Sequence, residues 1–302
     1  MTKKTVGLIG LGTVGTYMSN MLLPAGYKMY VWDIRKEAVE KLQASGAGAA
    51  GNPRVLAEKS DIILLSLPTS DDVEEVILGK NGLLDSLKKE SIVIDMSTVM
   101  PSRTVKLAFK LNAEGKKMLD APVSFGAKGL EVFVGGPKEV FNIARDVLET
   151  VAHKVTWVGE SGQGHVVKLV QNMISAGYIA IISEAIAFAV KNGANPELTL
   201  KAIETTGAGS GLLEWGIPFI LGRNFNSAGE LALHLKDIKY MLATGEESGS
   251  KLPITSQIHD IFEWTAENGD ANWEQFGIVS WWEKQMGIEV KRKSEPGAKV
   301  DD

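Results

Sequence analysis

The sequence contains no cysteine, so disulfide bonds and thiolate chemistry are excluded. It also lacks a large charge excess: 32 basic and 37 acidic residues leave a net charge of −5, which gives no reason to expect nucleic acid as a partner. The amino terminus, MTKKTVGLIG, enters a strand-like run without the apolar segment and cleavage site of a signal peptide. We therefore expect a cytoplasmic protein.

Long uninterrupted hydrophobic runs are scarce as well. The most apolar stretch, Met173 to Val190, is broken by Ser175, Ser183 and Glu184, which favours a buried helix over a membrane span. A helix this apolar needs more cover than its own small domain provides. We therefore expect no membrane association, and a homodimer or homotetramer that is built on this part of the chain.

The first half of the chain alternates short apolar runs with helix-length amphipathic segments. The runs are rich in Val, Ile and Leu and are bounded by turn residues or charge: TVGLIG, KMYVWD, DIILLSLP, SIVIDMST, KMLDAPVS, LEVFVGG and HKVTWVG. Such runs, separated by helical patterns, predict βαβ units and a parallel sheet that is buried on both faces.

The pattern changes after about residue 160. The segment SGQG at 161–164 has the composition of a flexible breaker, and the pattern beyond it is helical. Within that part, Asn195 and Pro196 suit the N-cap and the first position of a helix. The tail, KRKSEPGAKVDD, lacks periodicity. The sequence thus predicts an α/β domain over 1–161, an all-helical domain over 162–290 and a disordered tail over 291–302.

Glycines in G-x-G-x-x-G spacing lie where the first apolar run meets the first helical pattern. Gly10 allows a tight turn, Gly12 leaves a bare backbone that a pyrophosphate can approach, and Gly15 permits close packing of helix on strand. The phosphates would lie at the helix N-terminus, where free N–H groups favour anions. The segment predicted to bind a dinucleotide comprises Gly10, Leu11, Gly12, Thr13, Val14 and Gly15. This context makes the first domain Rossmann-type.

The end of the second apolar run bears on which dinucleotide is bound. Asp33 lies there, and a carboxylate at this place accepts hydrogen bonds from the ribose 2′-hydroxyl and repels a 2′-phosphate. Arg35 could soften that preference by lying over the adenosine. The sequence predicts NAD as the cofactor, with NADP as the alternative.

Several stretches, in the same order along the chain, resemble the β-hydroxyacid dehydrogenases, which include 3-hydroxyisobutyrate and 2-(hydroxymethyl)glutarate dehydrogenases. They are GLIGLGTVGTYMSNMLLPAGY, DMSTVMPS at 95–102, DAPVSFGAKG at 120–129, GQGHVVKLVQN at 162–172 and KDIKYM at 236–241. The resemblance implies a Rossmann-type domain followed by an all-helical domain that also forms the dimer.

The resemblance also implies a reaction. Lys168 matches the family's catalytic lysine, which would act as general acid and base while a hydride passes between the carbinol carbon of a small 3-hydroxy acid and nicotinamide. The reverse reaction would reduce a semialdehyde, and no metal is needed. Asn172 and Ser175 lie four and seven residues further on, so a helix presents all three on one face. Asn172 would hold the substrate or the lysine, and Ser175 would reach the substrate.

Further residues take cofactor roles by the same resemblance. Leu67 and Pro68 would lie beside the cofactor ribose, and Thr98 would contact the nicotinamide side of the cofactor. Lys236 would reach the nicotinamide portion from the helical domain, with Asp237 orienting it by a hydrogen bond.

The substrate carboxylate is assigned to one segment. Ser124, with the backbone of Phe125 and Gly126, would bind it through hydroxyl and N–H donors. The family usually has two glycines after this serine, and its following loop is longer. A phenyl ring at Phe125 changes the shape of the pocket, so the departure concerns which substrate is bound rather than the reaction.

Two other functions stay open, as does the role of one histidine. An imine reductase has the same architecture, although such enzymes usually lack the lysine found at Lys168. A non-catalytic dinucleotide sensor would keep Asp33 but would have no reason to keep Lys168, Asn172 and Lys236 together. His165, one turn before Lys168, could line the same cleft, although the family tolerates many residues there. The other histidines are expected to be structural.

Overall fold

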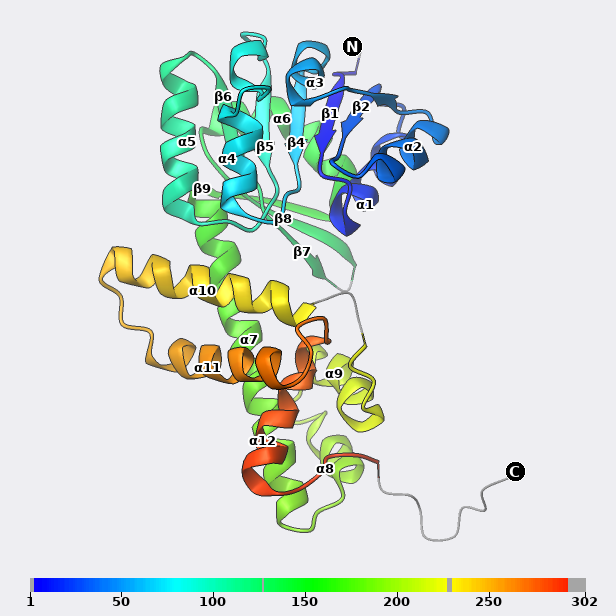
Figure 1. The fold of residues 1–302 in the computed structure, drawn as a ribbon, viewed down its shortest axis with the longest axis vertical. Helices are drawn as coiled ribbons and strands as arrows, with labels where there is room; N and C mark the ends of the chain where they lie inside the picture. Colours follow the sequence, from blue (N-terminus) through cyan, green and yellow to red (C-terminus); the bar gives the residue numbers. More distant parts are fainter. Residues whose placement is uncertain (1–2, 127, 227–229, 293–302) are drawn as a thin grey trace. The chain divides into compact units, whose positions relative to one another are not determined.

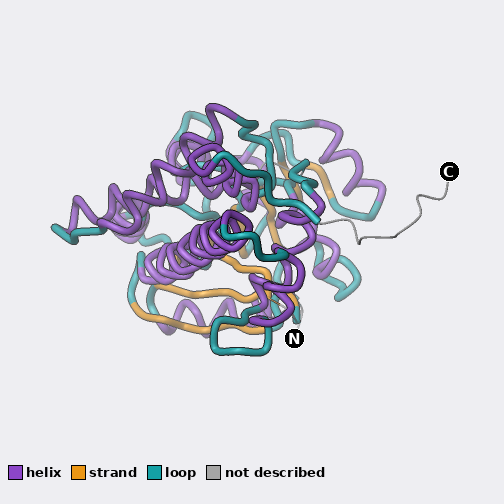
Figure 2. Tube along the Cα trace, turned by 90° about the horizontal axis from the view of Figure 1, so that it is seen from below, coloured by secondary structure: helices purple, strands orange, loops and turns teal. Residues whose placement is uncertain are grey.

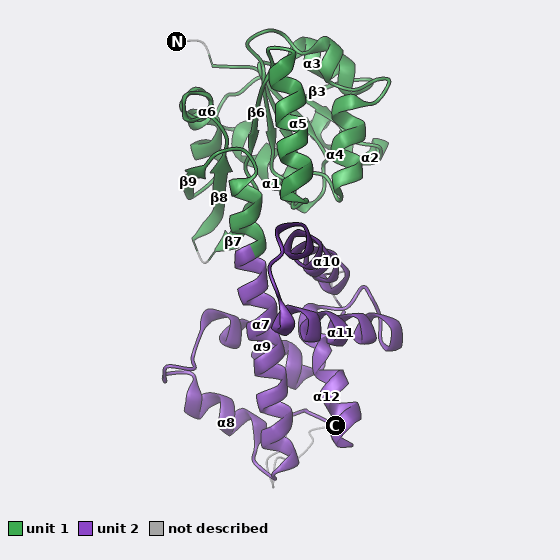
Figure 3. Cartoon of the chain, turned by 90° about the vertical axis from the view of Figure 1, so that its left-hand side faces the viewer, with its two compact units in different colours: residues 1–169 green, residues 170–302 purple. Residues whose placement is uncertain are grey.

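A computed structural model describes residues 3–126, 128–226 and 230–292. The chain divides into two compact units, Met1–Leu169 and Val170–Asp302, which we call unit 1 and unit 2 (Figure 3). The division falls inside one continuous helix, α7 (Gln163–Lys191). Among the described residues, every named strand lies in unit 1; the strands are orange in Figure 2.

In the described part of unit 1, nine strands form one sheet in the order β3-β2-β1-β4-β5-β6-β8-β7, with β9 paired to β8. The strands are β1 (Val6–Ile9), β2 (Met29–Trp32), β3 (Gly48–Ala49), β4 (Ile62–Leu65), β5 (Ile92–Asp95), β6 (Lys117–Asp120), β7 (Val123–Gly126), β8 (Gly129–Gly135) and β9 (Lys154–Gly159). Pairing is parallel from β3 through β6, as predicted, whereas β8 is antiparallel to β6 and β7.

The run KMLDAPVS was expected to be one strand, and this was wrong. It forms β6 and β7, which are separated by Ala121 and Pro122. Proline has no N–H to donate to a neighbouring strand, so it interrupts the ladder at this point.

Apolar side chains cover both faces of the sheet, because successive side chains of a strand point to opposite faces. Leu8 and Val31 belong to one core layer, and Ile9 and Leu65 belong to the other. The first layer includes residues of α1 (Thr13–Leu22), α2 (Lys36–Ala44) and α6 (Lys138–Val151). The second includes residues of α3 (Pro53–Lys59), α4 (Ser70–Leu78) and α5 (Pro101–Ala113), and Figure 1 shows the helices against the sheet.

The described part of unit 2 is helical apart from one isolated bridge between Asn226 and Trp273. After α7 it contains α8 (Pro196–Ile203), α9 (Gly211–Gly222), α10 (Glu230–Ser248), α11 (Pro253–Asn268) and α12 (Val279–Met286). As predicted, Asn195 caps α8, and its side chain accepts hydrogen bonds from the first turn.

The predicted disordered tail lies mostly outside the described residues. Its first part is described, however, and the Arg292 N–H donates to the Leu221 carbonyl at 3.2 Å. The bonded backbone of unit 2 therefore extends past residue 290.

By length and composition alone, α7 is apolar enough to cross a membrane.

Candidate active site

The cofactor residues predicted for unit 1 follow strands that end level with one another. The register pairs Ile9 with both Trp32 and Leu65, and Leu65 with Asp95. The segments after β1, β2, β4 and β5 therefore emerge at one edge, where open α/β sheets bind ligands. These segments carry Gly10 to Gly15, Asp33, Leu67 with Pro68, and Thr98.

The glycines of the first segment differ in what surrounds them. Gly10 has a φ of 89°, and a Cβ there would lie 2.0 Å from the Ser66 carbonyl oxygen. A Cβ on Gly15 would lie 2.0 Å from the carbonyl oxygen of Gly10. A Cβ on Gly12 would meet nothing within 4 Å. The fold thus requires Gly10 and Gly15, whereas Gly12 faces open space.

The N-terminus of α1 fits an anion. The helix begins after Gly12 with no side-chain cap and no acidic residue in its first turn. The N–H groups in the first turn of a helix have no partner within that helix, and in α1 this turn begins with Thr13 and Val14. Because the backbone at Gly12 is open to approach, a pyrophosphate fits against these groups. The residues present therefore suit a dinucleotide.

Asp33 is fixed by several donors directly after β2. Its carboxylate accepts hydrogen bonds from the Leu11 N–H at 2.6 Å and the Arg35 N–H at 2.8 Å, and the Arg35 guanidinium approaches to 3.1 Å. Burial raises the pKa of Asp33, but these bonds outweigh burial and hold the pKa below its ordinary value. The group is an ionised acceptor at neutral pH, and Arg35 is bound to it.

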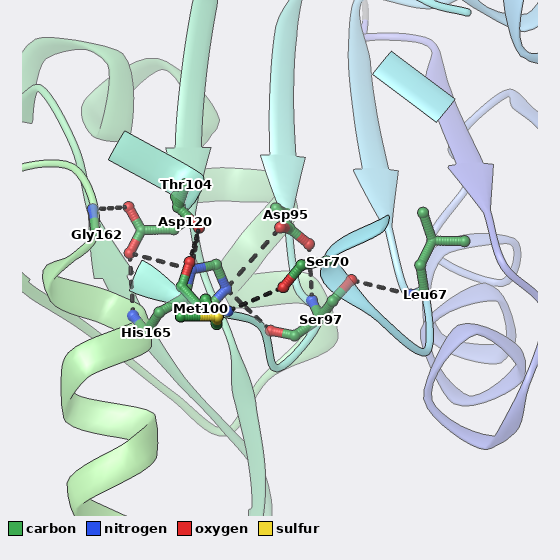
Figure 4. A network of polar contacts seen from close by, with 9 residues as sticks. All are labelled: Leu67, Ser70, Asp95, Ser97, Met100, Thr104, Asp120, Gly162 and His165. Atoms are coloured by element: carbon green, nitrogen blue, oxygen red, sulfur yellow. Dashed lines mark hydrogen bonds and ion pairs between the residues drawn. The ribbon is translucent and has the colours of Figure 1, made fainter. Parts of the chain in front are cut away.

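A buried polar cluster lies at the same edge, where β5 and β6 end and α7 begins (Figure 4). Its members are Asp95, Ser97, Thr104, Asp120 and His165, and all are buried. The His165 ring contacts the Ser97 carbonyl oxygen at 3.0 Å and the Thr104 hydroxyl at 2.9 Å. His165 therefore faces the interior of unit 1 and does not line a cleft.

Asp120 explains the glycines that precede Lys168. Its carboxylate accepts hydrogen bonds from the N–H groups of Gly162 at 2.7 Å and His165 at 3.1 Å. A Cβ on Gly164 would lie 2.7 Å from that carboxylate. The expectation of a flexible breaker at SGQG was wrong, because these glycines are needed for close packing around a buried acid.

Asp95 is the least satisfied member of the cluster. One carboxylate oxygen accepts the Ser97 N–H at 3.0 Å; the other has no hydrogen-bond partner and lies 4.0 Å from the His165 ring. Burial raises the pKa of Asp95, and His165 and Ser97 offset only part of the rise. This cluster was not predicted from the sequence. The sequence did contain one indication of it: Asp95 and Asp120 are each the last residue of a strand, and Asp33 is the first residue after one.

Helix α7 carries the predicted catalytic face. Lys168, which is nearly buried, lies in unit 1 one turn after His165, and Asn172 and Ser175 follow on the same side in unit 2. Within unit 2, the Asn172 amide donates to Asp237 at 2.7 Å. The other carboxylate oxygen of Asp237 lies 3.1 Å from the Lys236 ammonium, so the expected Asp237–Lys236 contact is present.

Two further contacts support this face. The His234 ring donates to the Asn172 carbonyl at 3.3 Å and also contacts the Gln275 amide, which fixes the backbone at Asn172. The Ser175 hydroxyl accepts from the Gln171 amide at 3.0 Å.

The segment assigned to the substrate carboxylate lies in β7, which pairs with β8. In β7, Phe125 pairs with Leu130 and Gly126 with Gly129 of β8. Ser124 is half-buried, whereas Phe125 is exposed and meets the Tyr17 ring edge-on at 5.5 Å. Pairing with β8 occupies part of the backbone that was expected to bind a carboxylate.

Both parts of the chain match models of known protein families. Residues 5–159 match the family model for the NAD binding domain of 6-phosphogluconate dehydrogenase. Residues 162–282 match the model described as NAD-binding of NADP-dependent 3-hydroxyisobutyrate dehydrogenase.

Individual proteins agree with these models. The chain is 33% identical to 2-(hydroxymethyl)glutarate dehydrogenase of Eubacterium barkeri over 94% of its own length and 97% of that protein. It is 34% identical to 2-hydroxy-3-oxopropionate reductase of Escherichia coli, with 91% and 95% covered. A solved Mycobacterium tuberculosis 3-hydroxyisobutyrate dehydrogenase with L-serine shares the fold, with a TM-score of 0.85 at 24% identity over 93% of this chain and 99% of that one. The chain therefore belongs to the β-hydroxyacid dehydrogenases, which are NAD(P)-dependent oxidoreductases that act on CH–OH groups.

Proposed function

We propose that this protein is an NAD-dependent dehydrogenase of a small 3-hydroxy acid, or a reductase of the matching semialdehyde. The observation that carries this proposal is the face of α7, where Lys168 precedes by one turn an asparagine that Asp237 holds at 2.7 Å. When bound, the nicotinamide supplies or accepts the hydride. Lys168 takes the proton of the substrate hydroxyl during oxidation and returns it during reduction.

The contact between Asn172 and Asp237 orients the asparagine for this role. Because a carboxylate can only accept, the amide nitrogen of Asn172 faces Asp237 and the amide oxygen is directed elsewhere. That oxygen is an acceptor for the substrate hydroxyl or for the Lys168 ammonium. We assign Ser124 and Ser175 to the substrate, and Lys236 to the nicotinamide portion of the cofactor.

The names of two relatives narrow the proposed substrate class. Both 2-(hydroxymethyl)glutarate and 2-hydroxy-3-oxopropionate carry a one-carbon alcohol or aldehyde on the carbon next to a carboxylate. We propose the same feature for the substrate of this protein. In this proposal, the exposed Phe125 ring on β7 selects among acids by the shape of their remaining substituent.

The test of this function is nicotinamide absorbance at 340 nm with a panel of acids. The panel contains 2-(hydroxymethyl)glutarate, 3-hydroxyisobutyrate and 2-hydroxy-3-oxopropionate, with lactate as the 2-hydroxy acid control. We expect kcat/KM for at least one panel member to exceed that for lactate by about 100-fold, roughly 2.7 kcal/mol. Binding of NADH without turnover of any member would favour the non-catalytic sensor.

Cofactor choice tests Asp33. Because its ionised carboxylate repels a 2′-phosphate, kcat/KM with NAD should exceed that with NADP by about tenfold or more. Asp33→Asn should narrow this ratio, whereas Glu37→Gln, which removes an exposed acid in the first turn of α2, should leave it unchanged. Equal efficiency of wild type with both cofactors would contradict the assignment.

Assembly tests the exposed face of α7. We propose a homodimer or homotetramer, because Val170, Ile174, Ile181 and Phe188 leave an apolar helix surface exposed in unit 2. Light scattering at micromolar concentration should give a multiple of the chain mass, and Ile181→Glu should reduce it. Phe109→Glu, at an even more exposed apolar side chain on α5 of unit 1, is the control. A monomeric wild type would rule this proposal out.

A further inference from the structure

The His165 ring is held at both of its nitrogens. It is completely buried, and the group at its Nε2 is the Ser97 carbonyl oxygen at 3.0 Å, which can only accept a hydrogen bond. Nε2 therefore carries a proton. Nδ1 lies 2.9 Å from the Thr104 hydroxyl, which is also 3.4 Å from the Met100 carbonyl oxygen. Both ring nitrogens are engaged, which leaves neither for a substrate.

The partners of this ring come from segments that end at the cofactor edge (Figure 4). Ser97 follows β5, and its hydroxyl accepts the Leu67 N–H, which follows β4, at 2.9 Å. Thr104 lies in the first turn of α5. One buried ring thus joins the start of α7 to the segment that carries Thr98 and, through Ser97, to the segment that carries Leu67.

The backbone of the same turn is fixed from the other side. Asp120 holds the N–H groups of Gly162 and His165, and its carboxylate lies 3.9 Å from the ring. Removal of the ring would leave the Ser97 carbonyl and the Thr104 hydroxyl buried without this partner. Such losses favour a shifted turn over a preserved one, because an unsatisfied buried polar group is costly.

We propose that His165 is a positioning residue for the reaction. It fixes the first turn of α7 to the segments after β4 and β5, and so sets within unit 1 the position of Lys168 relative to the nicotinamide end of the cofactor site. The inference rests on the proposed role of Lys168 in proton transfer. His165 touches neither substrate nor cofactor and acts through the lysine one turn away.

The experiment compares His165→Leu with His165→Gln in the full-length protein. Leucine fills similar space without a donor, whereas glutamine presents an N–H that can reach the Ser97 carbonyl. We expect His165→Leu to lower kcat by about 10–100-fold, as misplaced catalytic groups do. The Kd for NADH should stay within about threefold, and His165→Gln should recover most of the lost kcat. A kcat within about threefold of wild type for His165→Leu, or an equal loss in both variants, would overturn the proposal.

A double-mutant cycle separates this inference from the proposed function. If His165 acts through Lys168, His165→Leu should cost little further kcat in a Lys168→Ala background. Full additivity in the cycle would refute the positioning role while leaving the role of Lys168 intact. High activity of Lys168→Ala alone would instead refute the proposed function. Should His165→Leu fail to fold, Thr104→Val removes only the hydroxyl that contacts Nδ1, and the same cycle with that variant decides.

Discussion

Lys168→Ala should lower kcat by about 10²–10⁴-fold, the usual range for loss of a general acid–base group. The NADH Kd should change little, because none of the predicted cofactor residues lies on α7: they follow β1, β2, β4 and β5, apart from Lys236 on α10. Lys168→Arg should fail almost as badly, since a guanidinium does not give up its proton near neutral pH and needs more room than this nearly buried position offers. Steady-state kinetics with NADH fluorescence titration gives both quantities.

Lys191→Ala provides the control, since this lysine lies at the far end of the same helix. It should retain wild-type kcat. If Lys168→Ala keeps more than about a tenth of kcat, Lys168 is not the group that moves the proton. His165 could not then replace it, because both nitrogens of that buried ring are engaged, and Lys236 would be the next residue to test.

Gly12→Ala should weaken NADH binding by about tenfold to 100-fold without lowering the Tm of the free protein. Its backbone has a φ of −69°, which alanine adopts readily, and the added methyl group would meet no protein atom within 4 Å. The methyl group would instead occupy the space through which a pyrophosphate reaches the N-terminus of α1. Thermal unfolding and fluorescence titration separate the two effects.

Gly15→Ala is the matched comparison, because its methyl group would lie 2.0 Å from a backbone oxygen that cannot move aside. It should lower the Tm as well as NADH binding. Unchanged NADH affinity in Gly12→Ala would mean that the dinucleotide does not cross this glycine.

The parts of the site that the sequence predicted are local ones. Gly10, Gly12 and Gly15 belong to a single strand–turn–helix, and Asp33 directly follows the neighbouring strand, so their spacing along the chain fixes their arrangement. The parallel sheet and the capped start of α8 were predictable for the same reason, since short-range patterns specify both.

The buried cluster depended on topology that spacing does not encode. His165 and Ser97 are 68 residues apart, and they meet only because β5 and β6 are neighbours in the sheet. The glycine-rich segment at 161–164 was misjudged for a different reason, because the same glycines suit both a flexible linker and a tightly packed turn. The atoms beside Gly164 distinguish the two, because a Cβ there would lie 2.5 Å from the Phe133 carbonyl oxygen and 2.7 Å from the Asp120 carboxylate. The pairing of β7 with β8 was not predicted, because the spacing of two strands along the chain does not say which strand each one pairs with.

The continuity of α7 across the two units constrains how this chain can be recombined with its relatives. A chimaera that takes its helical unit from another protein must be spliced inside a helix, between Leu169 and Val170. One inserted residue there would rotate everything beyond it by about 100° and advance it by about 1.5 Å, so Asn172 would leave the face of Lys168. An insertion of seven residues would nearly restore the phase while lengthening the helix by about 10 Å. Exchange of helical units among such chains is therefore limited to crossovers that preserve the residue count through this helix.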